Sequence, residues 1–283
     1  MNWRIACLIF AGIVLGTYAQ AAEKKQKMSP SFGEIKNSKL LDRLVAAYPD
    51  FLRSHDGKTL LWKDGTAMLF DDGRAAKPFD QLLNAPDLQD QFYASYKRGK
   101  IGLAPVKNID PGRIRFQPFF TKMYGDCQKK QVAQNLKTII WLPGHGGRKV
   151  RVTTINNVAA NLQKISLELD KLLDKQPGMK KYLSPMSGTY NCRKIAGTKR
   201  YSVHAYGAAV DINVKQAHYW RWSKPGKTGL YPWRNNIPLE IVEIFERHGF
   251  IWGGKWYHYD TMHFEYRPEL LTAASSKKRK KQK

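Results

Sequence analysis

Two short passages in the C-terminal third of the chain contain the residue types of a metal site. The first holds His204 and Asp211, and the second holds Asp260 and His263. Two imidazoles and one carboxylate can bind a catalytic zinc ion and leave its fourth position open for water. His204, Asp211 and His263 are therefore predicted to bind one Zn²⁺ per chain, provided that the two passages meet in space.

A second carboxylate has a natural role beside such a site. Two neutral imidazoles and one carboxylate leave a zinc site with a net positive charge, so bound water stays acidic and a scissile carbonyl is polarised. Asp260 lies three residues before His263. It can take a proton from that water and deliver it to a leaving amine. The pattern predicts amide hydrolysis with zinc-bound water as the nucleophile and Asp260 as the general base.

These residues also have structural interpretations. A single histidine is more often a satisfied polar residue than a ligand, and Asp211 could form an ion pair with Arg193 or Arg200. Glu265 lies two residues after His263 and can share its strand face. It could support that histidine, contact substrate or form a surface salt bridge. The joint occurrence of the two passages in one chain favours the metal site.

Several motifs around these residues resemble the zinc D-alanyl-D-alanine peptidases. This group includes the D,D-carboxypeptidases and dipeptidases of vancomycin resistance and the L-alanyl-D-glutamate endopeptidase domains of phage endolysins, and it shares its fold with the Hedgehog signalling domain. The resemblance covers roughly residues 119–270. The motifs that carry it are residues 188–193, Ser-Val-His at 202–204, Gly207, Asp-Ile-Asn at 211–213 and residues 252–265.

The resemblance implies a role for several residues. His204, Asp211 and His263 match the zinc ligands, and Asp260 matches the acidic catalytic residue. The family also has an arginine on the strand before the first histidine, which contacts substrate or the oxyanion, and Arg193 is its best candidate. A structural ion pair is the alternative for this arginine. The further candidates for substrate contact are Ser202, Tyr201 and Trp256, with Trp252 as a second possible wall of the cleft.

The hydrophobic pattern predicts the elements that must position these residues. Apolar residues recur at helical spacing over 155–172, and Pro238 and Gly249 bound a second helix. Strands are expected at 138–142, 208–214, 250–252 and 262–264, with Ala209, Asp211 and Asn213 on one face. The expected fold class is α+β. The resemblance specifies a Hedgehog/DD-peptidase-like domain, with a small antiparallel sheet and packed helices, plus an N-terminal accessory region.

The predicted organisation has four parts. Residues 1–21 resemble a signal peptide, because Arg4 precedes a short apolar stretch and Ala21 ends a group of small residues typical of a signal-peptidase cleavage site. A membrane anchor is the alternative, but the stretch is shorter than the ~20 residues of a spanning helix. Residues 22–118 form a linker and accessory region, in which Ser38 caps a helix that Pro49 stops and 59–62 is a short strand. The zinc peptidase domain spans 119–270, and a basic disordered tail spans 271–283.

Export and charge restrict the partners. After removal of residues 1–21 two cysteines remain, Cys127 and Cys192, which predict a disulfide, with two separate buried thiols as the alternative. The formal net charge of +25 becomes +24 once the single charge of Arg4 is removed. An exported, periplasmic or secreted protein of this charge would meet anionic envelope polymers. No nucleic-acid motif is present, so nucleic acid is not a predicted partner, and no transmembrane segment is expected in the mature chain.

The leading hypothesis is an exported zinc peptidase that cuts the peptide stem of bacterial peptidoglycan. The sequence leaves open whether it acts as a D-Ala-D-Ala carboxypeptidase or as an L-Ala-D-Glu-type endopeptidase. The alternative is a non-catalytic envelope-binding protein with the same fold. Asp260 separates the two hypotheses, since a protein that only binds has no need of a carboxylate at that position.

Overall fold

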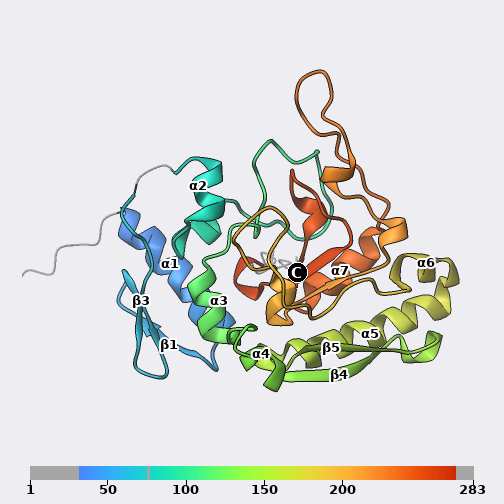
Figure 1. Cartoon of the computed structure of the whole chain (residues 1–283), viewed down its shortest axis with the longest axis horizontal. Coiled ribbons are helices and arrows are strands. Elements are labelled where there is room, and N and C mark those ends of the chain that lie inside the picture. Colours follow the sequence, from blue (N-terminus) through green and yellow to red (C-terminus); the bar gives the residue numbers. More distant parts are fainter. Residues whose placement is uncertain (1–31, 75–76, 272–283) are drawn as a thin grey trace, which may run out of the picture. The chain divides into compact units, whose positions relative to one another are not determined.

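Two of the three predicted metal ligands, Asp211 and His263, lie on a small antiparallel sheet in the computed structural model, which describes residues 32–74 and 77–271 (Figure 1). His204 lies in a 3₁₀ turn, Val203–Tyr206, just before that sheet. The strand order of the sheet is β6–β8–β7, with β6 at Ala209–Asp211, β8 at His263–Tyr266 and β7 at Phe250–Trp252. Asp211 is paired with His263, and Val210 with Phe264. Alternation along β8 therefore places His263 and Glu265 on one face and Phe264 and Tyr266 on the other.

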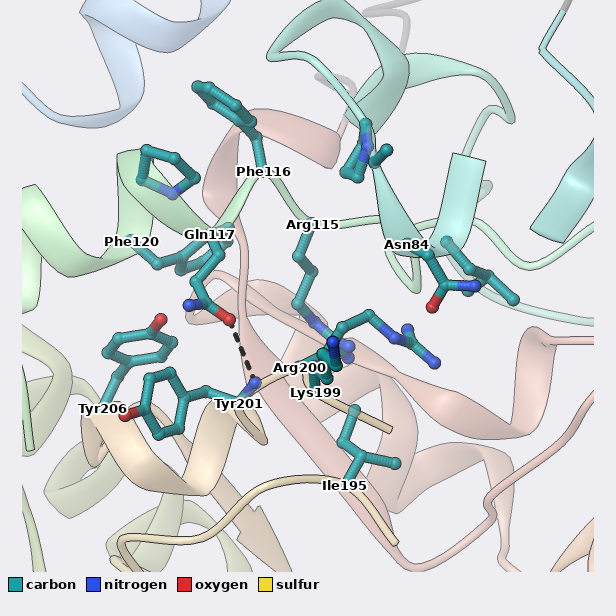
Figure 2. Close-up of a pocket in the computed structure, with 14 residues that line it drawn as sticks. Asn84, Arg115, Phe116, Gln117, Phe120, Ile195, Lys199, Arg200, Tyr201 and Tyr206 are labelled. Atoms are coloured by element: carbon teal, nitrogen blue, oxygen red, sulfur yellow. Dashed lines mark hydrogen bonds between the residues drawn. The ribbon is translucent and has the colours of Figure 1, made fainter. Parts of the chain in front are cut away.

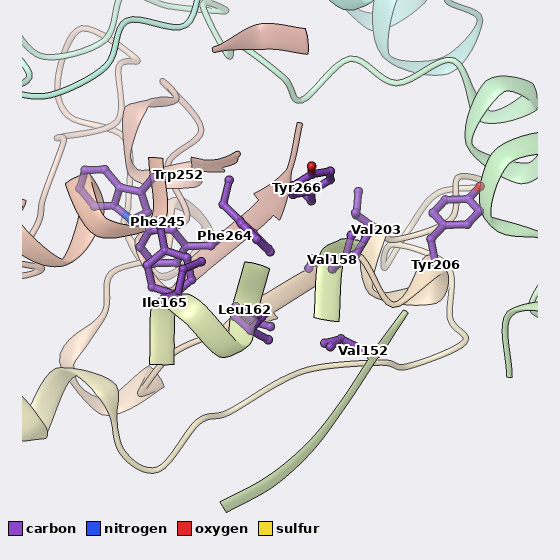
Figure 3. Packing of buried hydrophobic residues seen from close by; sticks show 14 of the residues in the cluster. Val152, Val158, Leu162, Ile165, Val203, Tyr206, Phe245, Trp252, Phe264 and Tyr266 are labelled. Atoms are coloured by element: carbon purple, nitrogen blue, oxygen red, sulfur yellow. The ribbon is translucent and has the colours of Figure 1, made fainter. Parts of the chain in front are cut away.

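Two helices cover the apolar face of this sheet. They are α5, at Val158–Lys175, and α7, at Leu239–Arg247. The ring of Phe245 from α7 stacks on Phe264, with ring centroids 3.9 Å apart. Leu162 and Ile165 from the predicted helical stripe of α5 are fully buried in the same cluster (Figure 3). This packing holds β8 in place, so that its opposite face can position polar side chains.

A hairpin of β4 (Leu136–Trp141) and β5 (Arg148–Thr153) packs against α5. The backbone amide of Thr153 donates to the carbonyl oxygen of Gly207, at 3.0 Å. Gly207 has a φ of +67°, and a Cβ there would lie 2.9 Å from Leu136. Glycine is thus required where the chain turns from His204 toward β6. The short helices around this layer are α3 (Gln117–Tyr124), α4 (Gln131–Gln134) and α6 (Lys180–Leu183).

The residues before 119 share the hydrophobic core of the rest of the described chain. Leu41 and Leu44 of α1 and Trp62 of β2 are buried in the same cluster as Phe264. The predicted strand at 59–62 matches β2. This part of the chain contains α1 (Phe32–Ala47), a sheet of order β1–β2–β3 (Leu52–His55, Thr59–Trp62 and Ala67–Leu69) and α2 (Phe79–Asn84).

The structure corrects two local predictions. Helix α1 begins at Phe32, so Ser38 lies inside it and does not cap it. Strand β6 ends at Asp211, because Asn213 instead caps a short 3₁₀ turn, where its side chain accepts from the Lys215 amide. Asn213 is therefore not on the strand face of Asp211.

The α+β fold class is confirmed, with small antiparallel sheets and several helices. No helix within residues 32–74 and 77–271 is long and apolar enough to cross a membrane. The predicted signal segment, the lysine-rich linker up to residue 31 and nearly all of the basic tail lie outside the described residues. The boundary near residue 118 stays a prediction.

Candidate metal centre and active-site cleft

Three side chains converge as candidate metal ligands. Nε2 of His204 lies 3.1 Å from Oδ2 of Asp211, and Nδ1 of His263 lies 3.0 Å from Oδ1 of the same carboxylate. One donor atom from each residue falls within 4.8 Å of the others. Ligand atoms that each lie about 2.0–2.2 Å from one shared zinc ion are separated from one another by distances of this size. The donor set and its geometry therefore fit one zinc ion, and Asp211 is paired with these histidines rather than with Arg193 or Arg200.

The other nitrogen of each histidine ring also has a partner. Nδ1 of His204 lies 2.7 Å from the carbonyl oxygen of Thr189, and Nε2 of His263 lies 3.0 Å from Oε2 of Glu265. A carbonyl oxygen and an ionised carboxylate can only accept, so each of these nitrogens donates its hydrogen, and the opposite nitrogen of each ring is directed at Asp211. Partners of this kind fix the tautomer and orientation of metal-binding histidines.

Glu265 belongs to a buried network of charges that reaches Tyr48, the residue directly after helix α1. It forms ion pairs with Arg115 and, at 3.1 Å, with Arg267. Arg267 pairs with Glu269 at 2.5 Å, and the hydroxyl of Tyr48 donates to Glu269 at 2.6 Å. Burial raises the pKa of Glu265, but the positive charges of Arg115, His263 and Arg267 outweigh it and lower that pKa well below its usual range. Glu265 is therefore an ionised acceptor for His263.

The backbone around the ligands is packed closely against them. Gly188 and Asp211 exchange two backbone hydrogen bonds, at 2.8 and 3.1 Å. A Cβ at Gly188 would lie only 2.9 Å from Oδ2 of Asp211. Oγ of Ser202 accepts from the amide of His204, at 3.4 Å, and caps the 3₁₀ turn that carries this histidine. Ser202 thus helps to position His204, and it also lines the cleft.

Asp260 lines the same cleft as the three candidate ligands. Its Oδ1 atom is buried and has no hydrogen-bond partner in the described structure. Burial, followed by the negative charge of Asp211, raises the pKa of Asp260 to about 6. An unpartnered carboxylate oxygen beside a ligand set is available for a proton from water or substrate.

The cleft has a volume of about 350 Å³ and is rich in cations. Arg193 lines it, is exposed, and makes no ion pair with any residue in the described ranges. The structural ion pair considered for this arginine is therefore not observed. The expected strand is also absent, because the chain here is a loop with one isolated bridge, between Lys194 and Tyr201.

The predicted disulfide is confirmed. Cys127 and Cys192 are bonded, with their Cα atoms 5.6 Å apart. The bond attaches the loop of Arg193 to the turn between α3 and α4. The alternative of two separate thiols is wrong for this structure.

The structure separates the three aromatic candidates. Trp256 lines the cleft, with its ring centroid 5.7 Å from that of His263, and donates from Nε1 to the Pro111 carbonyl at 2.6 Å. Trp252 does not line the cleft, because it is buried in the core beside Phe264. Tyr201 lines a neighbouring pocket instead.

Several residues of the cleft were missed by the sequence analysis. Arg113 and Arg115 come from the region assigned as accessory and flank the buried Ile114. This alternation of basic and apolar residues is the signal that could have indicated them. His258 also lines the cleft, and its ring lies 2.6 Å from the buried carboxylate of Asp110. The cleft is also lined by Ile195, Ala196, Tyr219, Arg221 and Trp222, which were missed as well.

A second acidic group needs no metal. Carboxylates of Asp71, Asp72 and Asp87 also lie within 4.8 Å of one another. Nζ of Lys77 is 3.0 Å from Asp72, 2.9 Å from Asp87 and 2.6 Å from Asp90. The ammonium group is therefore a cation already bound by two of the three carboxylates, and it offsets part of their charge.

The described residues thus form an α+β protein with a candidate zinc centre in a cationic cleft. Residues 196–266 match a family model described as D-alanyl-D-alanine carboxypeptidase, a family of zinc peptidases. This match confirms the family resemblance over a segment that contains His204, Asp211, Asp260 and His263. Arg193 lies just outside it. Neither the curated proteins nor the solved structures that were compared contain a match to the chain.

Proposed function

We propose that this protein is an exported zinc-dependent peptidase of Hedgehog/DD-peptidase-like fold that hydrolyses an amide bond in the peptide stem of bacterial peptidoglycan. The observation that carries the proposal is the convergence of His204, Asp211 and His263 beside the unpartnered Asp260. The family match over residues 196–266 supports it. When bound, a zinc ion supplies an acidified water and a Lewis acid for the carbonyl.

Asp260 moves the proton in this proposal. Its buried Oδ1 atom has no competing donor, so it can accept a proton from the attacking water and pass it to the leaving nitrogen. A pKa of about 6 leaves the group ionised at neutral pH yet basic enough to hold a proton briefly. The position of the Asp260 carboxylate beside the candidate zinc ligands favours an enzyme over the alternative of an envelope protein that only binds.

The cations of the cleft bind and orient the substrate. Arg193 is exposed there and is free to donate to a substrate carboxylate or to a developing oxyanion. Ser202 holds the turn of His204, and Trp256 forms the wall beside His263. The disulfide supports export, since such bonds persist in oxidising compartments. D-Ala-D-Ala and L-Ala-D-Glu bonds both remain candidates.

A digest of purified sacculi tests the proposal. Wild-type protein should release stem fragments, identified by mass spectrometry, and a chelator should stop their release. Asp260→Ala should abolish release while one zinc per chain stays bound. The exposed Asp50→Ala serves as a control for the loss of a carboxylate and should leave release unchanged. Full activity of Asp260→Ala would reject the mechanism.

A further inference from the structure

A second pocket adjoins the cleft and has no role in the proposed mechanism. It has a volume of about 260 Å³ and lies between residues 83–86, residues 115–118 and the loop 195–201 (Figure 2). Arg115 and Ile195 line both this pocket and the cleft of the candidate zinc centre. Its size suits part of a ligand rather than a whole one. A molecule bound in the cleft can therefore extend past these two residues into the pocket.

Arg200 is the unusual residue of this pocket. It is partly buried, and its Nε atom is buried with no hydrogen-bond partner in the described structure. It makes no ion pair with any residue in the described ranges, whereas the neighbouring Arg115 is held by Glu265. Burial, and then the charges of Arg115, Arg113 and Arg221, lower the pKa of Arg200 to about 10. A half-buried guanidinium among like charges is unfavourable, and an anion would relieve that cost.

The other walls of the pocket indicate which kind of anion it could bind. The pocket lining contains Lys199 and Arg115 besides Arg200, and it contains no carboxylate. Figure 2 shows the side chains of Arg115 and Arg200 side by side, with the amide of Asn84 across from Arg200. The remaining walls are mostly apolar. A guanidinium fork matches the planar, bidentate geometry of a carboxylate. The pocket therefore suits a carboxylate on a short aliphatic chain.

We propose that Arg200 and its pocket bind a carboxylate of the peptide stem that is not part of the cleaved bond. This inference rests on the proposed function, because the stem is the molecule that would lie in the adjoining cleft. Arg193 and Arg200 then contact two separate points of one substrate. Residues 83–86 and 115–118, which precede the predicted peptidase domain, help to select it.

The test uses a synthetic stem pentapeptide with free side carboxyl groups and the matched peptide in which these groups are carboxamides. Wild-type, Arg200→Gln, Arg200→Lys and Lys164→Gln proteins are assayed with both peptides. Lys164 is exposed on α5, so its substitution removes one positive charge elsewhere. Binding of each peptide is measured in parallel by calorimetry on the zinc-loaded proteins, with Asp260→Ala added to each so that the peptide is not cleaved. Zinc content and circular dichroism check that each variant is folded.

Wild-type protein should bind the free-carboxyl peptide about 10- to 100-fold more tightly than the carboxamide, as a charge-assisted hydrogen bond predicts. Arg200→Gln should remove this preference by raising KM for the free-carboxyl peptide, with kcat little changed. Arg200→Lys should restore part of it, and Lys164→Gln should leave it intact. Equal effects of Arg200→Gln on both peptides, or none, would overturn the inference.

The outcomes also separate this inference from the proposed function. Retained chelator-sensitive cleavage without a carboxylate preference rejects the Arg200 pocket and leaves the peptidase. Carboxylate-dependent binding without any cleavage rejects the peptidase and leaves the pocket. Calorimetry with a polyphosphate chain tests an anionic wall polymer as the ligand. Arg200-dependent binding of that chain, together with no Arg200-dependent binding of the peptide, would reject the stem carboxylate.

Discussion

Glu265 accepts the Nε2 hydrogen of His263, at 3.0 Å, while Nδ1 of the same ring lies 3.0 Å from Asp211. The two residues are neighbours on one face of β8. Glu265 is in turn held by Arg115 and Arg267. A candidate metal ligand is thus connected by buried ion pairs to a segment far from it in sequence, which explains why Glu265 is fully buried despite its charge.

Glu265→Gln should lower zinc affinity by roughly 10- to 100-fold, because the neutral amide makes the His263 ring a weaker donor to the metal. It also leaves Arg115 and Arg267 without their shared counter-charge. We therefore expect the free energy of unfolding to fall by about 3–5 kcal/mol. Competition with a chromophoric chelator measures the first effect, and urea unfolding measures the second.

Glu240→Gln is the matched control, since Glu240 is exposed on α7. Its zinc affinity and stability should equal those of the wild type. A Glu265→Gln variant with unchanged zinc affinity would show that Glu265 does not act through His263.

The activity of the protein should fall with acid as Asp260 becomes protonated. Burial and the charge of Asp211 raise the pKa of this carboxyl to about 6, and a bound dication lowers it. A general base must be ionised to accept a proton, so kcat/KM should rise with pH, be half-maximal at or below about pH 6, and level off about one pH unit above that midpoint. A pH profile of stem-peptide hydrolysis measures this. A plateau that begins only above pH 8 would contradict the role of Asp260.

The same pKa affects the stability of the metal-free protein. Folding raises the pKa of Asp260 from its ordinary value of 3.8 to about 6, so the folded state favours the neutral acid. The stability that this preference gives is fully present below about pH 4 and is lost as pH rises through 6. Asp260→Asn keeps a neutral group at every pH. Its metal-free Tm should therefore exceed that of wild type at pH 8 and match it at pH 4.

Gly188→Ala should weaken metal binding without unfolding the protein. The added Cβ would lie 2.9 Å from Oδ2 of Asp211, closer than such contacts normally come. The carboxylate must leave its present position between the two histidines, so zinc affinity should fall at least tenfold, by analogy with loss of an orienting partner. Gly178→Ala is the control, because no atom lies within 4 Å of its added Cβ. Equal zinc affinities for the two variants would disprove this contact.

The local pattern of the sequence indicated the candidate ligands and the helices and strands around them. Two motifs contain His204, Asp211, Asp260 and His263. The regular spacing of apolar residues around these motifs predicted α5, α7 and the strands of the sheet. These features are local, because a helix stripe or strand alternation is set by near neighbours in the chain.

The cationic wall of the cleft could not be predicted in the same way. Arg115 lies 150 residues before its partner Glu265, and Arg113 lies 145 residues before His258, to whose carbonyl oxygen it donates. Only tertiary packing brings these residues together. Trp252 and Trp256 have the same residue type and nearly the same position, yet one packs in the core and the other lines the cleft. Long-range contacts decide these assignments, and no spacing rule describes them.

Removal of the disulfide should loosen the loop that carries Arg193. Cys127 and Cys192 close a loop with a sequence separation of 65 residues, and a cross-link of this length restricts the unfolded chain. The double variant Cys127→Ser, Cys192→Ser should lose about 4 kcal/mol of unfolding free energy. Arg193 directly follows Cys192, so it should be positioned less firmly in the variant. The KM of the variant for a carboxylated stem peptide should therefore rise, while its zinc affinity stays unchanged. Urea unfolding, steady-state kinetics and zinc titration of the variant, with reduced wild type beside it, check the three expectations. A variant as stable as the oxidised wild type would show that the bond adds nothing to this fold.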